Sequence, residues 1–361
     1  MRPAGKKPED GTISRRELLR SAAGLCLATA CGPTPAATTA GEAAAVANVA
    51  RRFAGPVEVW SWFDLPDDPR SRELSGIAWD QATKTLWAVQ DETANIVPLI
   101  PGNHLKTWGF GPITTLRMAF PLDLEGIVIT PEGFVVASEK GPRILEVDRQ
   151  GQLRRDIPLP DHFAKARENK SLESLSQSPN GKWLFTTTEE ALSGDGARAT
   201  PATGTRVRVL RMPRFAGGEN TEHAYATDAS PHEGGDYGIA DLAALSENEL
   251  LVLERGWTRG YGNTARIYLT NLDNAAASCL LNPSLTPEAP VMPKKLLVDI
   301  AKLPAKGLPA MRQKQDSPLL DNYEGLAVGP RLPDGRHSLI LVSDDNGRSD
   351  QFARIVVLAV G

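Results

Sequence analysis

The chain has 361 residues, with 40 Lys and Arg against 44 Asp and Glu, so its formal net charge is −4. This balance argues against a basic nucleic-acid-binding protein. Three cysteines exclude a disulfide framework, so the fold must be stabilised by hydrophobic residues, which make up 41% of the chain. Glycine (32) and proline (28) are frequent enough to indicate many turns but not a disordered chain.

The N-terminal segment has the pattern of an export signal. Arg15 and Arg16 precede a short apolar run over residues 21–30, which is too short to span a bilayer. The segment is similar to twin-arginine export signals; the alternative is an ordinary amphipathic helix. Small residues before Cys31 are similar to a lipoprotein cleavage site, although Ala28 stands where leucine is preferred. We expect residues 1–31 to direct export, with Cys31 as a lipidation site or with plain cleavage nearby.

Residues 32–55 are rich in Ala, Thr, Pro and Gly and contain almost no large apolar residues. Such a segment cannot bury enough surface to fold alone. We interpret it as a tether; the alternative is an Ala-rich helix over residues 41–52, which would be marginal in isolation. The folded domain is therefore predicted to cover residues 56–361.

Within this domain a unit of four strands recurs. Each copy opens with a short apolar strand, turns at residues such as Asn180-Gly181 or Asp334-Gly335, and continues with a second apolar strand that ends in an acid. Asn-Gly and Asp-Gly between β-rich runs are strong hairpin signals. The five opening strands are predicted at 74–79, 124–129, 172–176, 239–245 and 323–328. The fourth strands are predicted at 57–65, 113–122, 153–159, 223–227 and 295–303.

This repetition predicts an all-β fold: a β-propeller of four-stranded antiparallel blades. Successive openings lie 48 to 83 residues apart, and propeller blades need about 40–50 residues. The longer steps contain insertions at 192–204 and 273–292, which we interpret as loops; a sixth blade hidden there is the alternative. Residues 352–360 and 57–65 are expected to be the third and fourth strands of the last blade, which would close the ring. A β-sandwich has a similar strand content but no reason to repeat acids at matching places.

Acidic residues recur at two places in the repeat. Opening strands carry Glu125, Glu173, Asp241 and Glu324, with Ser75 in the first copy, and second strands end in Asp91, Glu139, Glu189, Glu254 and Asp344. The start of one strand and the end of its hairpin partner lie at the same end of a sheet. We therefore expect these acids to gather at one mouth of a central channel.

Crowded carboxylates repel one another unless cations intervene. Calcium takes 6–8 oxygen ligands, which makes it the tentative cofactor, and the proposed ligands are Glu125, Glu173, Asp241, Glu324, Asp344 and Asp345. Nearby basic residues could form ion pairs or bind an anionic substrate, and Lys140, Arg255 and Arg348 are the candidates. The alternative is that each acid caps its own hairpin through backbone hydrogen bonds.

Several motifs together are similar to a known family. They are Asp123-Leu124-Glu125-Gly126, Asn322-Tyr323-Glu324-Gly325, Leu251-Val252-Leu253-Glu254-Arg255 and Val342-Ser343-Asp344-Asp345-Asn346. Over residues 70–360 the chain resembles the bacterial phytase-like family, also described as having an esterase-like activity of phytase. The resemblance implies a secreted or periplasmic β-rich protein that hydrolyses phosphate or other esters. Gly347 departs from the aromatic residue that the family usually has there.

Two functions follow as hypotheses. The first is an exported, calcium-assisted hydrolase of a small-molecule ester or phosphoester. The second is a noncatalytic binding propeller of the cell envelope, since the fold alone does not decide function. No Gly-x-Ser-x-Gly motif marks a serine esterase. We expect a periplasmic or lipid-anchored protein that contacts the membrane only through that lipid, and a monomer, because a closed ring has no long open edge.

Overall fold

The computed structural model describes residue 53 and residues 55–215, 217–272, 284–286 and 289–361. The predicted export signal, Cys31 and residues 32–52 of the predicted tether lie outside the described residues. Phe53 is buried, with 3% of its surface exposed, and packs in the hydrophobic core. The packed domain therefore includes this last part of the predicted tether.

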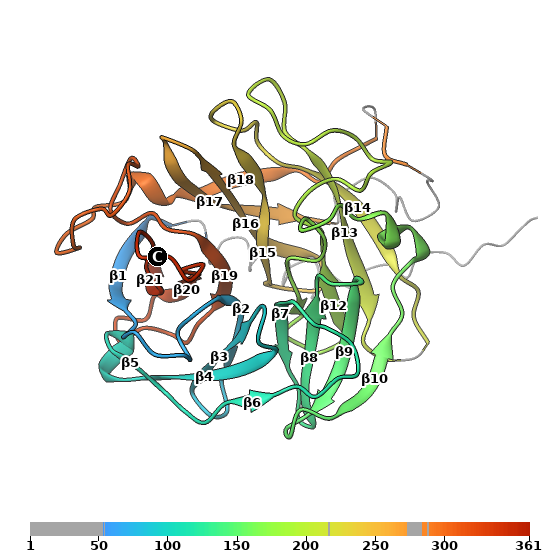
Figure 1. Ribbon diagram of the computed structural model, residues 1–361, viewed down its shortest axis with the longest axis horizontal. Helices are drawn as coiled ribbons and strands as arrows, with labels where there is room; N and C mark the ends of the chain where they lie inside the picture. The colour runs from blue at the N-terminus through green and yellow to red at the C-terminus, as the bar shows by residue number, and fades with distance from the viewer. Residues whose placement is uncertain (1–52, 54, 216, 273–283, 287–288) are drawn as a thin grey trace, which may run out of the picture.

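The described residues form five antiparallel sheets arranged in a ring, which confirms the predicted all-β propeller with five blades (Figure 1). Blade 1 contains β2 (Leu74–Asp80), β3 (Thr85–Gln90), β4 (Asn95–Pro101) and β5 (Trp108–Phe110), and β6 (Thr114–Thr115) also pairs with β4. Blade 2 contains β7 (Leu124–Ile129), β8 (Gly133–Ser138), β9 (Arg143–Asp148) and β10 (Leu153–Ile157). The fourth strand predicted at 113–122 is wrong, because the outer edge of blade 1 is split between β5 and the two-residue β6.

Blades 3 and 4 contain the insertions. Blade 3 contains β11 (Ser176–Gln177), β12 (Trp183–Thr186), β13 (Arg206–Pro213) and β14 (Thr221–Ala226). Blade 4 contains β15 (Asp236–Ala244), β16 (Glu249–Thr258), β17 (Gly262–Asn271) and β18 (Lys294–Asp299). The insertion at 192–204 is a loop, as predicted. The second predicted loop falls largely outside the described residues.

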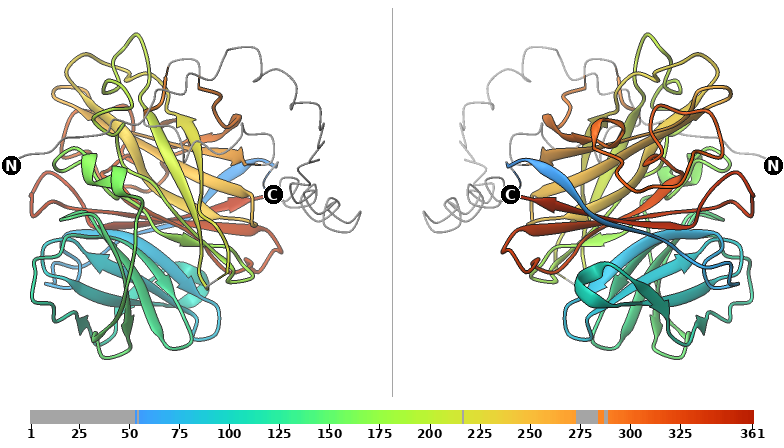
Figure 2. Two further views of the ribbon diagram at one scale, coloured as in Figure 1. Left: turned by 90° about the vertical axis from the view of Figure 1, so that its right-hand side faces the viewer. Right: turned by 90° about the vertical axis from the view of Figure 1, so that its left-hand side faces the viewer.

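Blade 5 joins the two ends of the domain. It contains β19 (Tyr323–Val328), β20 (His337–Ser343), β21 (Arg354–Val360) and, as its outer strand, β1 (Val57–Asp64). Strand β1 pairs antiparallel with β21 from Val57–Val360 to Asp64–Arg354, and the side views show the first strand beside the last (Figure 2). The predicted closure of the ring is confirmed. Closure of this kind leaves only short sheet edges exposed.

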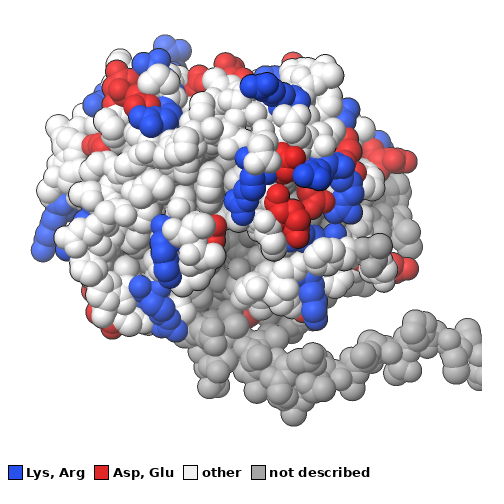
Figure 3. Space-filling view, turned by 90° about the horizontal axis from the view of Figure 1, so that it is seen from below, with Lys and Arg blue, Asp and Glu red and all other residues white. Residues whose placement is uncertain are grey.

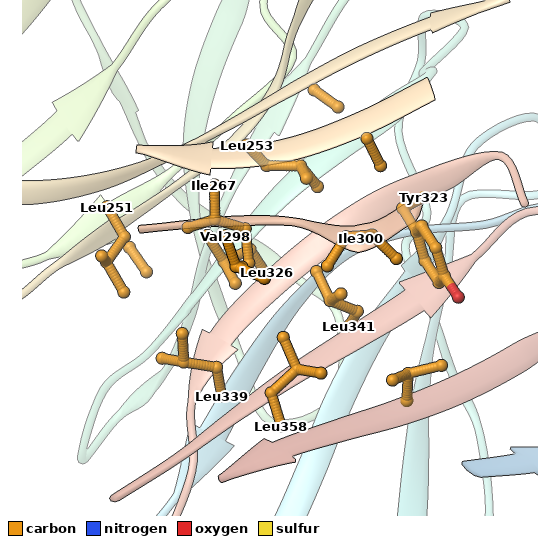
Figure 4. Packing of buried hydrophobic residues seen from close by; sticks show 14 of the residues in the cluster. Leu251, Leu253, Ile267, Val298, Ile300, Tyr323, Leu326, Leu339, Leu341 and Leu358 are labelled. Carbon is orange, nitrogen blue, oxygen red and sulfur yellow. The ribbon is translucent and has the colours of Figure 1, made fainter. Parts of the chain in front are cut away.

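One hydrophobic cluster lies between each pair of neighbouring blades. Between blades 4 and 5, Leu251 and Leu253 of β16 face Leu326, Leu339 and Leu341 of β19 and β20 (Figure 4). These side chains are almost fully buried, so each contributes about 1.5–3 kcal/mol relative to an exposed position. Contacts between the faces of the sheets therefore hold the ring together.

The opening strands β2, β7, β11, β15 and β19 lie nearest the axis, where glycine permits their close approach. A Cβ atom at Gly126 of β7 would lie 2.4 Å from the backbone nitrogen of Leu175, closer than real Cβ contacts allow. Among the described residues, helices are confined to three short 3₁₀ turns, Asn103–Leu105, Asp161–Lys165 and Ile300–Lys302. In the described part of the chain, no helix is long and apolar enough to cross a membrane.

Candidate functional site

One end of the channel is formed where the opening strands begin and the second strands end. The same backbone hydrogen bond marks this place in four blades: Asp91 N to Glu73 O, Glu139 N to Asp123 O, Glu189 N to Ser171 O and Asp344 N to Asn322 O, at 2.8–3.2 Å. In blade 4 the corresponding pair is Arg255 and Gly238. We call this end the mouth. Its second-strand ring consists of Asp91, Glu139, Glu189, Arg255 and Asp344.

A second ring comes from the opening segments of the blades, and β2, β7, β15 and β19 each have a β-bulge at this point. The bulge places two residues opposite one and lies at Glu125 in β7 and at Glu324 in β19. In blade 3, Glu173 N bonds to Thr187 O and Leu172 bridges Thr188, which puts Glu173 in the same position. The predicted alignment of Glu125, Glu173 and Glu324 is confirmed.

Asp241 is not in this ring, and its predicted alignment is wrong by one residue. The bulge of β15 lies between Ile239 and Asp241, so Ala240 occupies the place of the glutamates. Asp241 corresponds instead to Gly126, where the neighbouring blade is closest. Its carboxylate accepts hydrogen bonds from the backbone nitrogens of Leu242 and Leu326, both at 2.7 Å. Asp241 therefore links blades 4 and 5.

Glu254 is also displaced from its predicted place. It corresponds to Ser138 and Ser343, one residue before the ring, and successive strand residues point to opposite faces. Its carboxylate is fully buried and binds the hydroxyls of Tyr225 (2.6 Å) and Tyr237 (3.0 Å) and Lys294 Nζ (2.6 Å). Glu254 thus belongs to a polar network between blades 3 and 4, and Arg255 takes the ring position.

The remaining acids of the mouth are buried close together. Burial, followed by the charge of neighbouring carboxylates, raises the pKa of Glu125, Glu173 and Asp344 well above its usual range. Burial likewise raises the pKa of Asp91 to about 7, with Glu73 and Asp123 adding to the effect. Carboxylates in this state are stabilised in their charged form by nearby cations or by hydrogen-bond donors.

Three of these acids form the tightest group. Carboxylate oxygens of Asp123, Glu125 and Glu139 all lie within 4.8 Å of one another. Ser75, which replaces the glutamate of blade 1, donates a 2.6 Å hydrogen bond to Glu125 Oε2, and the Ser171 backbone nitrogen donates to Glu139 Oε1 at 2.7 Å. Carboxylates in such a group can bind a hard cation such as Ca²⁺. Asp123 and Glu139 were not among the predicted ligands, although their motif and ring position could have indicated them.

Basic residues line the side of the mouth that faces blades 4 and 5. Arg255 NH2 lies 2.9 Å from Glu324 Oε2, and Lys170 Nζ lies 2.9 Å from both carboxylate oxygens of Glu189. Although burial disfavours its charged form, the pKa of Arg255 is raised by Glu324 and Glu189, so it stays charged. Arg255 Nε is buried without a hydrogen-bond partner. It is therefore available to bind an anion.

A pocket of about 290 Å³ opens beside these two bases. Its walls are formed by Lys170, Arg255, Trp257, Asn322, Glu324, Asn346, Arg348 and Gln351. The structure thus brings two of the predicted substrate-binding residues, Arg255 and Arg348, to one pocket. The sequence prediction missed Lys170, because it comes from the loop before β11 and no repeat position marks it.

The other predicted site residues lie at the rim. Lys140 Nζ pairs with Asp123 Oδ2 at 3.0 Å, close to the acidic group but outside the pocket. Arg348 is half-exposed and pairs with Asp350 at 2.8 Å. Asp345 accepts hydrogen bonds from the backbone nitrogens of Glu73 and Gly347 at 3.3 and 3.2 Å. At the rim, Lys140 and Arg348 are therefore neutralised by neighbouring carboxylates. The acids without an ion-pair partner among the described residues, such as Glu125 and Glu173, lie deeper in the mouth.

The opposite end of the channel has a different lining. A cavity of about 410 Å³ is formed there by the far halves of the opening strands, including Ile129, Ala243, Ala244 and Val328. No charged residue contributes to the described walls of this cavity. On the outer face seen in Figure 3, basic and acidic side chains lie side by side in small groups.

Comparisons with solved structures give only distant likenesses. Among solved structures, the PQQ-bound aldose sugar dehydrogenase of Streptomyces coelicolor is 14% identical with a TM-score of 0.39, covering 85% of this chain and 98% of that one. The N-terminal domain of Nup159 is 11% identical with a TM-score of 0.36, covering 84% and 95%. These likenesses are too weak to support an argument, and the fold rests on the strand pairing.

Sequence comparisons are more informative. A protein of Arthroderma benhamiae, named "Uncharacterized secreted protein", is 27% identical over 207 residues, which cover 46% of this chain and 40% of that protein. The chain thus matches less than half the length of this relative. Residues 69–347 match the family model Phytase-like, described as "Esterase-like activity of phytase". Since this match spans most of the five blades and the whole mouth up to Gly347, the chain belongs to the phytase-like family.

Proposed function

We propose that this protein is an exported, calcium-dependent hydrolase of anionic esters, phosphoesters foremost, and that the mouth is its active site. One observation carries the proposal: a group of buried and part-buried carboxylates lies next to two part-buried cationic side chains, Lys170 and Arg255, at a single channel end. Membership in a family described by esterase-like activity supports the reaction class. The secreted relative supports export.

The acidic group fits a calcium ion by the chemistry of its donors. Asp123, Glu125 and Glu139 offer three carboxylates within 4.8 Å. Glu173 lies close enough to Glu125 that, after burial, the charge of Glu125 raises the pKa of Glu173 further. Calcium prefers such oxygens and completes its shell with carbonyls and water. Bound calcium would supply positive charge that polarises an ester oxygen and favours deprotonation of water.

Four of the six ligands predicted from sequence are left out of this central set. Both carboxylate oxygens of Asp241 accept backbone hydrogen bonds, and Glu324 is paired with Arg255. Asp344 and Asp345 lie on the blade 5 side, where Asp344 Oδ1 accepts a hydrogen bond from the Asn346 backbone nitrogen at 2.7 Å. They would contribute to the field around the cation.

The other side of the mouth would bind the anionic group of the substrate. Arg255 has a free Nε donor, and Lys170 carries three donors on a single ammonium group. Charge-assisted hydrogen bonds from such groups are about twice as strong as neutral ones. Asp91, with a pKa of about 7, is suited to accept or donate a proton near neutral pH.

The proposal includes export through residues 1–31 and lipidation of Cys31. Fractionation of cells that produce the full chain tests both steps. The wild-type protein should be in the envelope membrane fraction and the variant Cys31→Ser in the soluble exported fraction. Equal distribution of the two proteins would contradict lipidation, and retention of both in the cytoplasm would contradict export.

A second candidate is a noncatalytic binding module of the cell envelope. It is favoured by the pairing of the bases, since Lys170 is held by Glu189 and Arg255 by Glu324. In addition, none of the described residues that line the pocket is a histidine. In this case the mouth would bind calcium and an anion without turnover.

The deciding experiment measures ester hydrolysis with calcium and with a chelator. Substrates are a phosphomonoester, inositol hexakisphosphate and a carboxylic ester. We expect calcium-dependent release of product, lost in Glu125→Gln and kept in the control Glu132→Gln, an exposed acid on the far turn of the same blade. Calcium-dependent thermal stabilisation without any turnover would favour the binding module. Hydrolysis that persists in Glu125→Gln would show that the site is misplaced.

A further inference from the structure

Blade 4 differs from the other blades at the mouth in the length of its central hairpin. Strands β3, β8, β12 and β20 end before their ring residue, whereas β16 continues beyond Arg255 to Thr258. The ladder with β17 continues with it, pairing Trp257 with Asn263 and Thr258 with Gly262. Strand β15 extends equally far, since Asp236 pairs with Trp257. Blade 4 therefore raises a three-stranded wall over one side of the mouth.

Trp257 is the aromatic residue of this wall that lines the pocket beside Lys170 and Arg255. Its indole Nε1 donates a hydrogen bond to Gln313 Oε1 at 3.2 Å. Its one polar atom is thus already bonded, and the rest of the ring offers only carbon surface. Aromatic groups gain affinity from such a surface by stacking or edge contacts.

The basic residues of the mouth limit the charge that it can accept. Lys140, Lys170, Arg255 and Arg348 are each paired with a carboxylate. Arg255 Nε remains the one free donor found among the buried atoms of these four side chains. A polyphosphate would bring several negative charges close to Asp123, Glu125 and Glu139, whose carboxylate oxygens already lie within 4.8 Å of one another. A ligand with a single anionic group avoids this repulsion.

We infer that the substrates are esters with one anionic group and an aromatic organic part, which rests on Trp257 while Arg255 and Lys170 bind the anion. The inference rests on the proposed function, because it names the substrate class of the same mouth. It departs from a role in hydrolysing highly phosphorylated inositols. A pocket of about 290 Å³ lies at the lower end of the range for small-molecule sites and suits a single ring with its anionic group.

The test uses non-hydrolysable probes, so it does not depend on turnover. Binding of phenylphosphonate, methylphosphonate and inositol hexakisphosphate to the full exported chain is measured by calorimetry, with calcium and with a chelator. We expect phenylphosphonate to bind about five- to tenfold more tightly than methylphosphonate, the range of one aromatic contact. Trp257→Ala should remove this difference, and Arg255→Gln should weaken both phosphonates alike.

Trp79→Ala is the matched control, because Trp79 lines the cavity at the opposite end of the channel. Trp257→Phe should keep the preference for phenylphosphonate over methylphosphonate. This variant tests the aromatic contact with the wall intact if Trp257→Ala is unstable. Equal binding of the two phosphonates by the wild type, or tighter binding of inositol hexakisphosphate with chelator present, would overturn the inference. If the protein prefers phenylphosphonate but hydrolyses no ester, the proposed hydrolase function is refuted and the aromatic preference stands. If it hydrolyses alkyl and aryl phosphates equally well, the aromatic preference is refuted and the hydrolase function stands.

Discussion

The two ends of the channel are built from the same five opening strands but differ in chemistry. At the mouth, β7 and β19 carry Glu125 and Glu324, and burial raises the pKa of both. At the far end, the same strands contribute Ile129 and Val328 to a cavity whose described walls contain no charged residue. Charge is tolerated where β-bulges and loop residues supply partners, such as Ser75 for Glu125 and Asn322 for Glu324. The described walls of the far end consist of strand backbones and uncharged side chains, mostly apolar ones.

The largest effect is expected from placing an acid at the far end. Ala243 is buried, with 4% of its surface exposed, and lines the apolar cavity. Ala243→Asp would bury a carboxylate without a partner, which should lower the free energy of unfolding by about 4 kcal/mol. Urea unfolding measures the change, and Ala243→Ser, which adds no charge, is the control. If the Asp variant is as stable as the Ser variant, the far end can accommodate a charge, and the proposed difference between the two channel ends is wrong.

The second prediction removes a cation from the mouth. Arg255→Met leaves Glu324 buried beside Glu189 without its ion-pair partner, so we expect a loss of about 3 kcal/mol in the free energy of unfolding. The double variant Arg255→Met/Glu324→Gln should recover part of this loss, because the uncompensated charge is gone. Denaturant titration of the single and double variants gives the coupling energy. Simple additivity would show that the pair contributes nothing.

The third prediction concerns pH in the presence of a chelator. Burial raises the pKa of Asp91 from its ordinary value of 3.8 to about 7, so the folded protein holds this proton more tightly than the unfolded chain. The contribution of the protonated Asp91 to the free energy of unfolding is fully present below about pH 4 and is lost as the pH rises to about 7. Since Asp91 is partly exposed, we expect a loss of roughly 2 kcal/mol. Asp91→Asn should flatten this part of the stability profile, and an unchanged profile would contradict the assignment.

The smallest effect is expected at the rim. Arg348 and Asp350 form an exposed ion pair at 2.8 Å, and such pairs contribute about 0–1 kcal/mol. Arg348→Gln should therefore leave the free energy of unfolding almost unchanged, because solvent screens the pair. Thermal unfolding in low and high salt measures this. A larger loss, especially one that persists in high salt, would place Arg348 among the structural cations of the mouth.

Much of the fold could be predicted because each blade repeats the same local signals. Turn residues and apolar strands, including the two strands at 57–65 and 352–360, each leave a short-range pattern in the sequence. The structure confirms these elements. Blade 1 resisted prediction at its outer edge, where β6 is only two residues long. Pairing there depends on the neighbouring strand β4 and leaves little trace in the sequence.

The candidate site was predicted in blades that share the Glu-Gly motif and mispredicted in blade 4. There the acid follows one residue later, at Asp241, and β-bulges shift the register in a way that spacing alone does not show. The same one-residue error separates Glu254 from Arg255. Lys170 and Trp257 were missed because one comes from a connecting loop and the other from the extended part of β16.

The sequence alone determined the blade repeat, the ring closure and the acidic character of three opening strands, because these depend on local pattern and on identity at repeated positions. The tertiary structure decided which acids lie close together, which acids accept hydrogen bonds from backbone amides, and where the basic side chains lie. These positions depend on the strand register in each blade and on loops that reach the channel axis. The sequence pattern does not contain the distances between residues of different blades. The resulting mouth combines an acidic group from blade 2 with basic residues from blade 4 and the loop before β11.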